Sequence, residues 1–307
     1  MKMINFNLIK NKRLIWTLSS FLITFSFCGI LFSSFYPPIN NPINLGIDFV
    51  GGTEIRINRI CSNECSELIA DEIIDKLRLT YDDQQFLNNI TIQIQDNYNL
   101  ISIRTLENNI LSSKELLREI NEVVVPLDFS SEDYRDLGAK IGPSLLLSGA
   151  FSLVIALLSI AIYLSIRFDG KYAFLALIAL FHDLLIVFGT FSWLGILFSV
   201  EVNSLFAVSL LTIAGYSVND TVVIFDRIRE NVKSGKNIAF DNLIQNSVNE
   251  SFRRTIFTSI TTLIPLVSIM IFGSYTLFWF SVALALGIVI GSYSSILLAP
   301  SLLLKNK

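Results

Sequence analysis

The stretch Val202–Asn231, VNSLFAVSLLTIAGYSVNDTVVIFDRIREN, is a mostly apolar segment that carries one carboxylate, Asp220, before it becomes charged. Its apolar part fits the roughly 20 residues that a helix needs to cross the hydrocarbon layer of a membrane. A carboxylate at membrane depth costs roughly 2.5–3.5 kcal/mol on insertion scales, so chains seldom keep one without a partner or a task. The stretch therefore predicts a membrane protein in which Asp220 is the first candidate for carrying protons.

The composition of the whole chain agrees with a membrane protein. Its 307 residues are 52% hydrophobic and only 16% charged, against about 25% charged residues in soluble domains. The first apolar segment is too long for a signal peptide and lacks a small-residue cleavage site, which favours an uncleaved anchor. We expect six membrane spans, at Leu14–Phe35, Ser144–Ile166, Tyr172–Trp193, Val202–Phe225, Ile256–Phe272 and Leu277–Leu304.

Residues 36–142 form a separate domain with 18 acidic and 9 basic residues. This negative charge argues against nucleic acid as a partner. Alternating and helical patterns predict the order β-α-β-β-α-β, which is the ferredoxin-like arrangement. The predicted fold class is thus a six-helix membrane bundle with one small α+β domain. The chain divides into 1–35 (amino terminus and first span), 36–142, 143–304 (the other five spans, with a loop at 226–254) and a tail at 305–307.

The basic residues outside this domain predict the orientation. All 14 of them flank the spans on one side, and the short loops near 195–201 and 273–276 on the other side have none. Short cytoplasmic loops are enriched in Lys and Arg. We therefore expect both termini and residues 226–254 in the cytoplasm, and residues 36–142 outside, in the periplasm.

Cysteine and glycine carry weaker signals. Cys61 and Cys65 form a short-loop disulfide if their domain faces an oxidising compartment, and otherwise are two free thiols. Three cysteines and one histidine are too few for a zinc framework, so no metal site is predicted. The pair Gly51–Gly52 favours a backbone kink over phosphate binding. Because the chain also lacks a P-loop motif, direct ATP hydrolysis is not expected.

Polar residues inside the spans form the candidate site. Asp220 on the fourth span and Arg254 at the start of the fifth are expected to meet in the inner part of the bundle. Either they form a permanent ion pair or snorkel to the cytoplasmic interface, or Asp220 alternates between protonated and ionised forms while Arg254 moves. The side chains expected to support this pair are those of Tyr216, Asn219, Thr221 and Thr258.

A second polar pair, His182 and Asp183, lies near the middle of the third span. Asp183 either forms a proton relay with Asp220 or makes a structural hydrogen bond to the fourth span. On the sixth span, small residues recur at every fourth position, which favours close helix packing. These residues are Ala283, Gly287, Gly291 and Ser295.

Four motifs resemble the SecD/SecF family of protein-export membrane proteins, within the RND-type transporter superfamily. They are NLGIDFVGGTEI (Asn44–Ile55), LFHDLL (Leu180–Leu185), AGYSVNDTVVIFDRIREN (Ala214–Asn231) and RRTIFTSITTLIPL (Arg253–Leu266). The resemblance assigns the family's charged pair to Asp220 and Arg254. It also marks a periplasmic motif that contains Gly46, Asp48, Gly51 and Gly52.

The resemblance implies that proton motive force drives late stages of preprotein export across the bacterial inner membrane. The expected partners are a SecD-like subunit in a heterodimer, a SecYEG-like translocon with its associated membrane proteins, and the exported preprotein. The chain would be no enzyme and need no cofactor, with protons as the coupling ion. Two alternatives remain: a passive scaffold that stabilises the translocon, and an efflux subunit for small molecules or lipids. A membrane hydrolase is disfavoured because the sequence shows no nucleophile–base or metal constellation.

Overall fold

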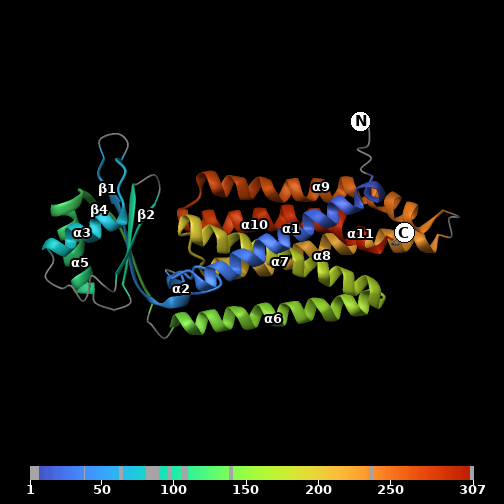
Figure 1. The fold of residues 1–307 in the computed structure, drawn as a ribbon, viewed down its shortest axis with the longest axis horizontal. Coiled ribbons are helices and arrows are strands. Elements are labelled where there is room, and N and C mark those ends of the chain that lie inside the picture. Colours follow the sequence, from blue (N-terminus) through green and yellow to red (C-terminus); the bar gives the residue numbers. More distant parts are fainter. Residues whose placement is uncertain are drawn as a thin grey trace. The chain divides into compact units, whose positions relative to one another are not determined.

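The computed structural model describes residues 7–37, 39–61, 65–80, 90–95, 99–105, 110–137, 141–234 and 238–304. The chain divides into two compact units (Figure 1), of which the membrane unit comprises Met1–Leu45 and Gly149–Lys307 and the small unit comprises Gly46–Ser148. The predicted tail at 305–307 lies outside the described residues. We describe each unit by itself.

Six helical segments in the described part of the chain are long and apolar enough to cross a membrane, which confirms the prediction of an integral membrane protein with six spans. The sixth is interrupted by a π-helical turn, η2. The spans are α1 (Leu8–Phe35), α6 (Ile141–Arg167), α7 (Gly170–Phe198), α8 (Ser204–Lys233), α9 (Phe240–Phe272), and the series α10 (Tyr275–Tyr293), η2 (Ser294–Leu298) and α11 (Ala299–Leu303).

The segment 226–254, predicted as a loop, is mostly helical. Helix α8 continues to Lys233 and α9 already begins at Phe240. The reason is that this polar sequence still places apolar residues on one helix face: Ile228, Ile244 and Val248 are buried. An amphipathic pattern of this kind supports helix beyond the apolar span.

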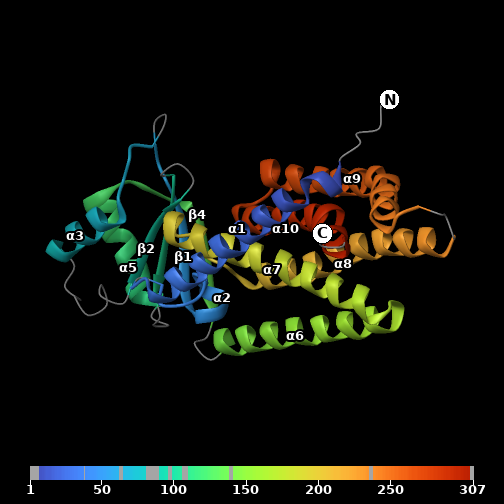
Figure 2. The same cartoon turned by 45° about the vertical axis from the view of Figure 1, so that its right-hand side comes forward.

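Small residues bring the helices of the membrane unit close together. A Cβ on Gly287 of α10 would lie 2.3 Å from the Ile213 side chain of α8, and one on Gly291 would lie 3.3 Å from Ser217. The predicted small-residue seam therefore packs α10 against α8. Figure 2 shows α1 running across α7, where Gly189 approaches Ser26 in the same way.

The small unit contains one antiparallel sheet with the strand order β2-β3-β1-β4. Helices α3 and α5 cover one face of it (Figure 1), and Ile57, Ile73, Leu77, Ile101 and Leu116 are almost fully buried between them. In chain order its elements are α2 (Ile47–Val50), β1 (Gly52–Arg59), α3 (Ala70–Thr80), β2 (Ile90–Gln95), β3 (Leu100–Thr105), α5 (Ile110–Glu119), η1 (Ile120–Val124) and β4 (Leu127–Leu137).

The cysteines of this unit form the Cys61–Cys65 disulfide, so the first of the two interpretations is correct. The neighbouring Arg59 is buried, and its guanidinium donates a hydrogen bond to the carbonyl oxygen of Ser66 at 3.0 Å. Together these contacts tie the segment after β1 back to the end of that strand.

Candidate functional site

Asp220 lies on α8 with only 3% of its surface exposed, and its Oδ2 has no hydrogen-bond partner in the described part of the chain. Arg254 on α9 is exposed and acts on Asp220 electrostatically, but the two side chains form no ion pair within 4 Å. The permanent contact pair considered from the sequence is therefore absent from this structure. A buried carboxylate oxygen without a partner is unusual, because burying charge is costly unless it is paired.

Arg254 lines a cavity of about 510 Å³ between α8 and α9. Charged side chains surround this cavity: Arg227 donates hydrogen bonds to Glu250 at 2.5 Å and to Glu230 at 2.7 Å. Asp226, also in its wall, pairs with Arg167 at 2.5 Å. Arg254 thus lies beside a space that is lined mainly by charged side chains.

Only some of the predicted supporting residues join α8 to α9. The hydroxyl of Tyr216 donates to Ser259 Oγ at 3.4 Å and accepts from Thr262 at 3.2 Å. Thr258 instead donates to the carbonyl oxygen of Arg254 on its own helix, and Asn219 is exposed. Tyr216 therefore makes the polar contact between these helices, with Ser259 and Thr262 of α9 in place of Thr258.

Asp183 lies fully buried on α7 and receives three hydrogen bonds. Ser217 Oγ of α8 and Ser294 Oγ of η2 each donate to its Oδ2 at 2.6 Å, and His182 Nδ1 lies 2.9 Å from its Oδ1. When Asp183 is ionised it only accepts, and the His182 ring then donates from Nδ1. The hydrogen bond to the fourth span, one of the two interpretations of Asp183, is present.

The π-helical turn η2 explains how the last span reaches two partners at once. Ser294 donates to Asp183, while the next residue, Ser295, shares a hydrogen bond with Thr221 at 2.8 Å and donates to the Ser217 carbonyl oxygen at 3.2 Å. Successive residues of an α-helix point about 100° apart. The wider π turn, which is frequent at functional sites, lets both serines face α7 and α8.

The residues missed from the sequence are Ser217 and Ser294. Ser217 does carry a signal, because it lies four residues before Thr221 and so shares a face of α8 with it. Ser294 carries none that helical spacing reveals, since its direction depends on η2. A series of hydrogen bonds runs from His182 and Asp183 through Ser217 and Ser295 to Thr221, the neighbour of Asp220 in sequence.

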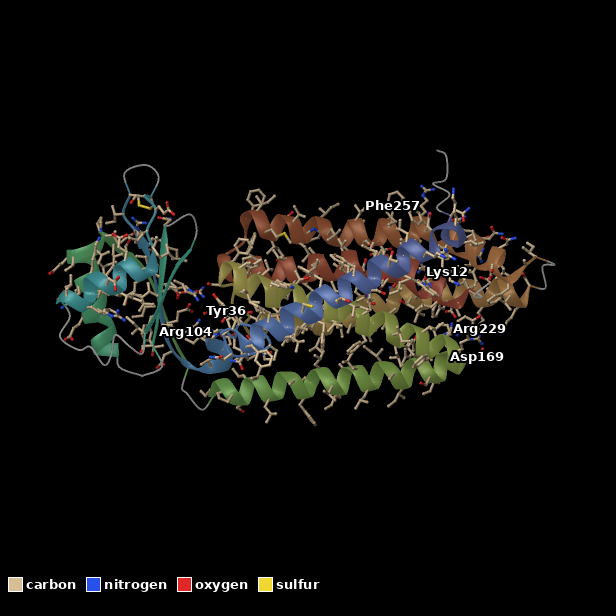
Figure 3. All side chains as sticks on the ribbon, viewed as in Figure 1. Lys12, Tyr36, Arg104, Asp169, Arg229 and Phe257 are labelled. Atoms are coloured by element: carbon tan, nitrogen blue, oxygen red, sulfur yellow. A yellow bond between two sulfur atoms is a disulfide. The ribbon has the colours of Figure 1, made fainter. Side chains whose placement is uncertain are left out.

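Basic residues gather at one end of the membrane unit. Figure 3 shows Lys12 and Arg229 near Asp169 at this end, and Tyr36, which follows α1, at the other. Arg229 donates to the carbonyl oxygen of Arg167, and Lys12 donates to that of Leu304. The start of α1, the α6–α7 connection and the end of the last span therefore lie on the same side.

The predicted glycine motif belongs to the small unit and has a backbone role. The carbonyl oxygen of Gly46 accepts from the amides of Phe49 and Val50 at the start of α2, whose first turn contains Asp48. Gly51 and Gly52 have φ values of 80° and 111°, which residues with a Cβ rarely adopt. They form the kink expected from the sequence, between α2 and β1.

Comparison with known proteins identifies the family. The model described as "Protein export membrane protein SecD/SecF, C-terminal" matches residues 117–307, and the "SecD/SecF GG Motif" matches residues 39–58. The chain belongs to the SecD/SecF protein-export family. The first match contains Asp183, Asp220 and Arg254, and the second contains the glycine motif. The resemblance stated from the sequence is therefore confirmed.

Individual members of the SecD/SecF family cover nearly the whole chain. It is 45% identical to protein translocase subunit SecF of Prochlorococcus marinus, with 98% of this chain and 95% of that protein covered. Identity to the Synechocystis subunit SecF is 38%, covering 96% and 92%. A crystal structure of SecDF from Thermus thermophilus, described as a translocon-associated membrane protein, aligns with a TM-score of 0.78 at 27% identity. That alignment covers 97% of this chain but 38% of the longer SecDF chain.

Proposed function

We propose that this chain is a SecF-like subunit that uses proton flow through its membrane unit to drive late stages of preprotein export. The observation that supports this most directly is Asp220, a buried carboxylate on a membrane-spanning helix with one oxygen that lacks a partner. An intramembrane carboxylate of this kind marks a candidate functional site. Membership in the SecD/SecF family supplies the coarser role, a subunit of the protein translocase.

The mechanism couples protonation of Asp220 to the position of Arg254. A proton entering from outside binds Asp220 while Arg254 lies in its charged cavity. The neutral carboxyl group then attracts Arg254 less, so α8 and α9 can shift and the small unit changes its affinity for the exported chain. Each proton crossing 100 mV supplies about 2.3 kcal/mol, which shifts a two-state equilibrium roughly 50-fold.

The proposed setting is the bacterial inner membrane, with both termini in the cytoplasm and the small unit in the periplasm. The basic end of the membrane unit supports this orientation, since cytoplasmic ends are rich in Lys and Arg. The Cys61–Cys65 disulfide supports an oxidising compartment for the small unit. The β-α-β-β-α-β order of that unit also leads us to assign it the ferredoxin-like fold.

The proposed partners are a SecD-like subunit in a heterodimer, a SecYEG-like translocon and the exported preprotein. The SecDF alignment supports the first, because this chain corresponds to little more than a third of that longer protein. In this proposal the chain is no enzyme and takes no cofactor, and protons are the coupling ion. The passive scaffold is the alternative that the next experiment separates.

The test compares wild type with Asp220→Asn for export into membrane vesicles that contain the SecD-like partner, with and without proton motive force. We expect the variant to co-purify with its partner and to lose the force-dependent part of export. Asp241→Asn, which changes an acid in the first turn of α9, is the matched control and should export normally. If assembled Asp220→Asn exports like wild type, the scaffold interpretation replaces the proposal.

A further inference from the structure

The chain connects its two units at two places. It leaves the membrane unit after Leu45 and returns to it at Gly149, inside α6. In the proposed function, a shift of α8 must reach the small unit through one of these connections. Helix α6, which the structure describes in full, is poorly suited to this, because no residue of its most apolar 18-residue window is buried. It therefore packs little against the other spans of this chain.

Residues 41–45, which we call the strap, form the first connection and are held firmly by the membrane unit. Two serines with 0% exposure donate hydrogen bonds to backbone carbonyl oxygens of the strap. Ser33 Oγ of α1 donates to Asn41 at 2.8 Å, and Ser192 Oγ of α7 donates to Pro42 at 2.7 Å. These two bonds fix the amino-terminal end of the strap to α1 and α7.

The other end of the strap is bound to the chain just before α8. The amide of Val202 donates to the carbonyl oxygen of Asn44 at 2.9 Å, and Leu45 pairs with Val202 in a parallel β-bridge. Helix α8 begins two residues later, at Ser204. Gly195 leaves room for this contact, since a Cβ there would lie 2.9 Å from Asn44 Cβ. The strap thus joins α1 and α7 at one end to the start of α8 at the other.

We propose that the strap transmits a shift of α8 to the small unit and so couples proton binding at Asp220 to movement of that unit. The inference rests on the proposed function, in which protonation of Asp220 lets α8 move. Helix α8 runs without interruption from Ser204 past Asp220, a length of about 24 Å at 1.5 Å per residue. Because the helix is continuous, a shift near Asp220 also displaces Val202 and, through its hydrogen bond, Asn44.

The glycine motif that follows the strap is compact enough to pass this movement on. Ile47 and Phe49 of α2 are buried, and the carbonyl oxygen of Gly46 accepts two backbone hydrogen bonds at the start of that helix. The first turn of α6 packs against the same kink, since a Cβ on Gly142 would lie 2.5 Å from the Gly51 amide nitrogen. A displacement of the strap therefore reaches β1 through a close-packed turn instead of a loose loop.

Slack after the strap tests this inference. Two glycines inserted between Leu45 and Gly46 lengthen the chain by up to about 7 Å, more than the helix shifts of roughly 1–2 Å that are common at interfaces. In vesicles that contain the SecD-like partner, we expect this slack variant to keep its proton flow. Its force-dependent export should fall by up to about 50-fold, the effect of one proton crossing roughly 100 mV. The same insertion between Gly273 and Ser274, in the exposed α9–α10 connection, is the matched control and should change neither rate.

The outcomes separate transmission from a merely structural role and from the proposed function. Loss of both proton flow and export by the slack variant would show that the strap only supports the bundle. Normal force-dependent export would show that it transmits nothing, and either result overturns the inference. Asp220→Asn in the same vesicles keeps the two proposals apart. If it exports normally, the proposed function is wrong; if it fails while the slack variant exports like wild type, only the strap inference is wrong.

A cross-link serves if the slack variant does not assemble with its partner. Neighbouring strands lie about 4.8 Å apart, within the Cα separations that disulfides span. Leu45→Cys combined with Val202→Cys can therefore be joined by oxidation across the β-bridge. We expect the cross-linked complex to keep its force-dependent export, because the strap and the start of α8 move together. Loss of export on cross-linking would mean that the two separate during the cycle, which contradicts transmission through this contact.

Discussion

The contact between α1 and α7 leaves no room for a methyl group at Gly189. A Cβ built there would lie 2.3 Å from Ser26 Cβ, 2.5 Å from Ser26 Cα and 2.7 Å from the Ser26 carbonyl oxygen. Carbon atoms in contact prefer about 3.5–4.0 Å. Two of the three atoms are backbone, so no side-chain rotation relieves the clash. Gly189→Ala therefore requires the helices to separate by more than about 1 Å.

The expected loss of stability follows from two opposing terms. Overpacking a close contact costs about 1–3 kcal/mol, and the backbone clash points to the upper part of this range. Alanine recovers up to about 1 kcal/mol because it favours helix over glycine. The net decrease in the free energy of unfolding should be about 2 kcal/mol.

Unfolding of the purified chain in mixed detergent micelles measures this effect, with tryptophan fluorescence as one signal. Trp193 is a suitable reporter, since it stacks on Phe25 at 5.2 Å across the same contact. Gly215→Ala is the matched control, because a Cβ there meets nothing within 4 Å. It should be neutral or slightly stabilising. Equal stability of the two variants would refute the close-packing argument.

Three further predictions concern single interactions. Ser294→Ala removes one hydrogen bond to the Asp183 carboxylate and should lower the free energy of unfolding by about 1.5–3 kcal/mol; in an Asp183→Asn background the loss should shrink, and an undiminished loss would mean that the bond is not responsible. Cys61→Ser opens a short disulfide loop and should destabilise the small unit by roughly 2 kcal/mol, as measured by urea unfolding with reduced wild type as the comparison. Ile57→Ala, at a position with 0% exposure, should cost about 2–5 kcal/mol in the same assay; a loss below 1 kcal/mol would argue against its place in the core.

The sequence was sufficient for the spans because a membrane imposes a length and a composition on each of them. It did not reveal how far α8 and α9 continue, since hydropathy detects only the apolar part of a helix. Beyond the apolar part, burial of Ile228 and Ile244 on one helix face stabilises the helix. The polar residues around them have a composition that is typical of a loop. The β-α-β-β-α-β order of the small unit could be predicted, because alternation marks a half-buried strand directly.

For the site, helical spacing predicted faces but not distances. It placed Asp220 and Arg254 on helices that do face each other, yet Arg254 lines a cavity and forms no ion pair with Asp220 within 4 Å. Counting in helical steps from Arg254 selected Thr258, while Tyr216 contacts Ser259, the next residue, and Thr262, one turn beyond Thr258. An error of one residue corresponds to about 100° around a helix.

The π turn at Ser294–Leu298 changes the phase of the last span. Before it, Gly287 and Gly291 pack against α8. After it, Ser301 accepts a hydrogen bond from the indole of Trp16 on α1 at 2.9 Å. One span thus packs against α8 before the turn and contacts α1 after it. Deleting one residue of this turn would barely shorten the span but would rotate everything beyond it by about 100°. The turn therefore sets the direction in which each residue of α11 points around the helix axis.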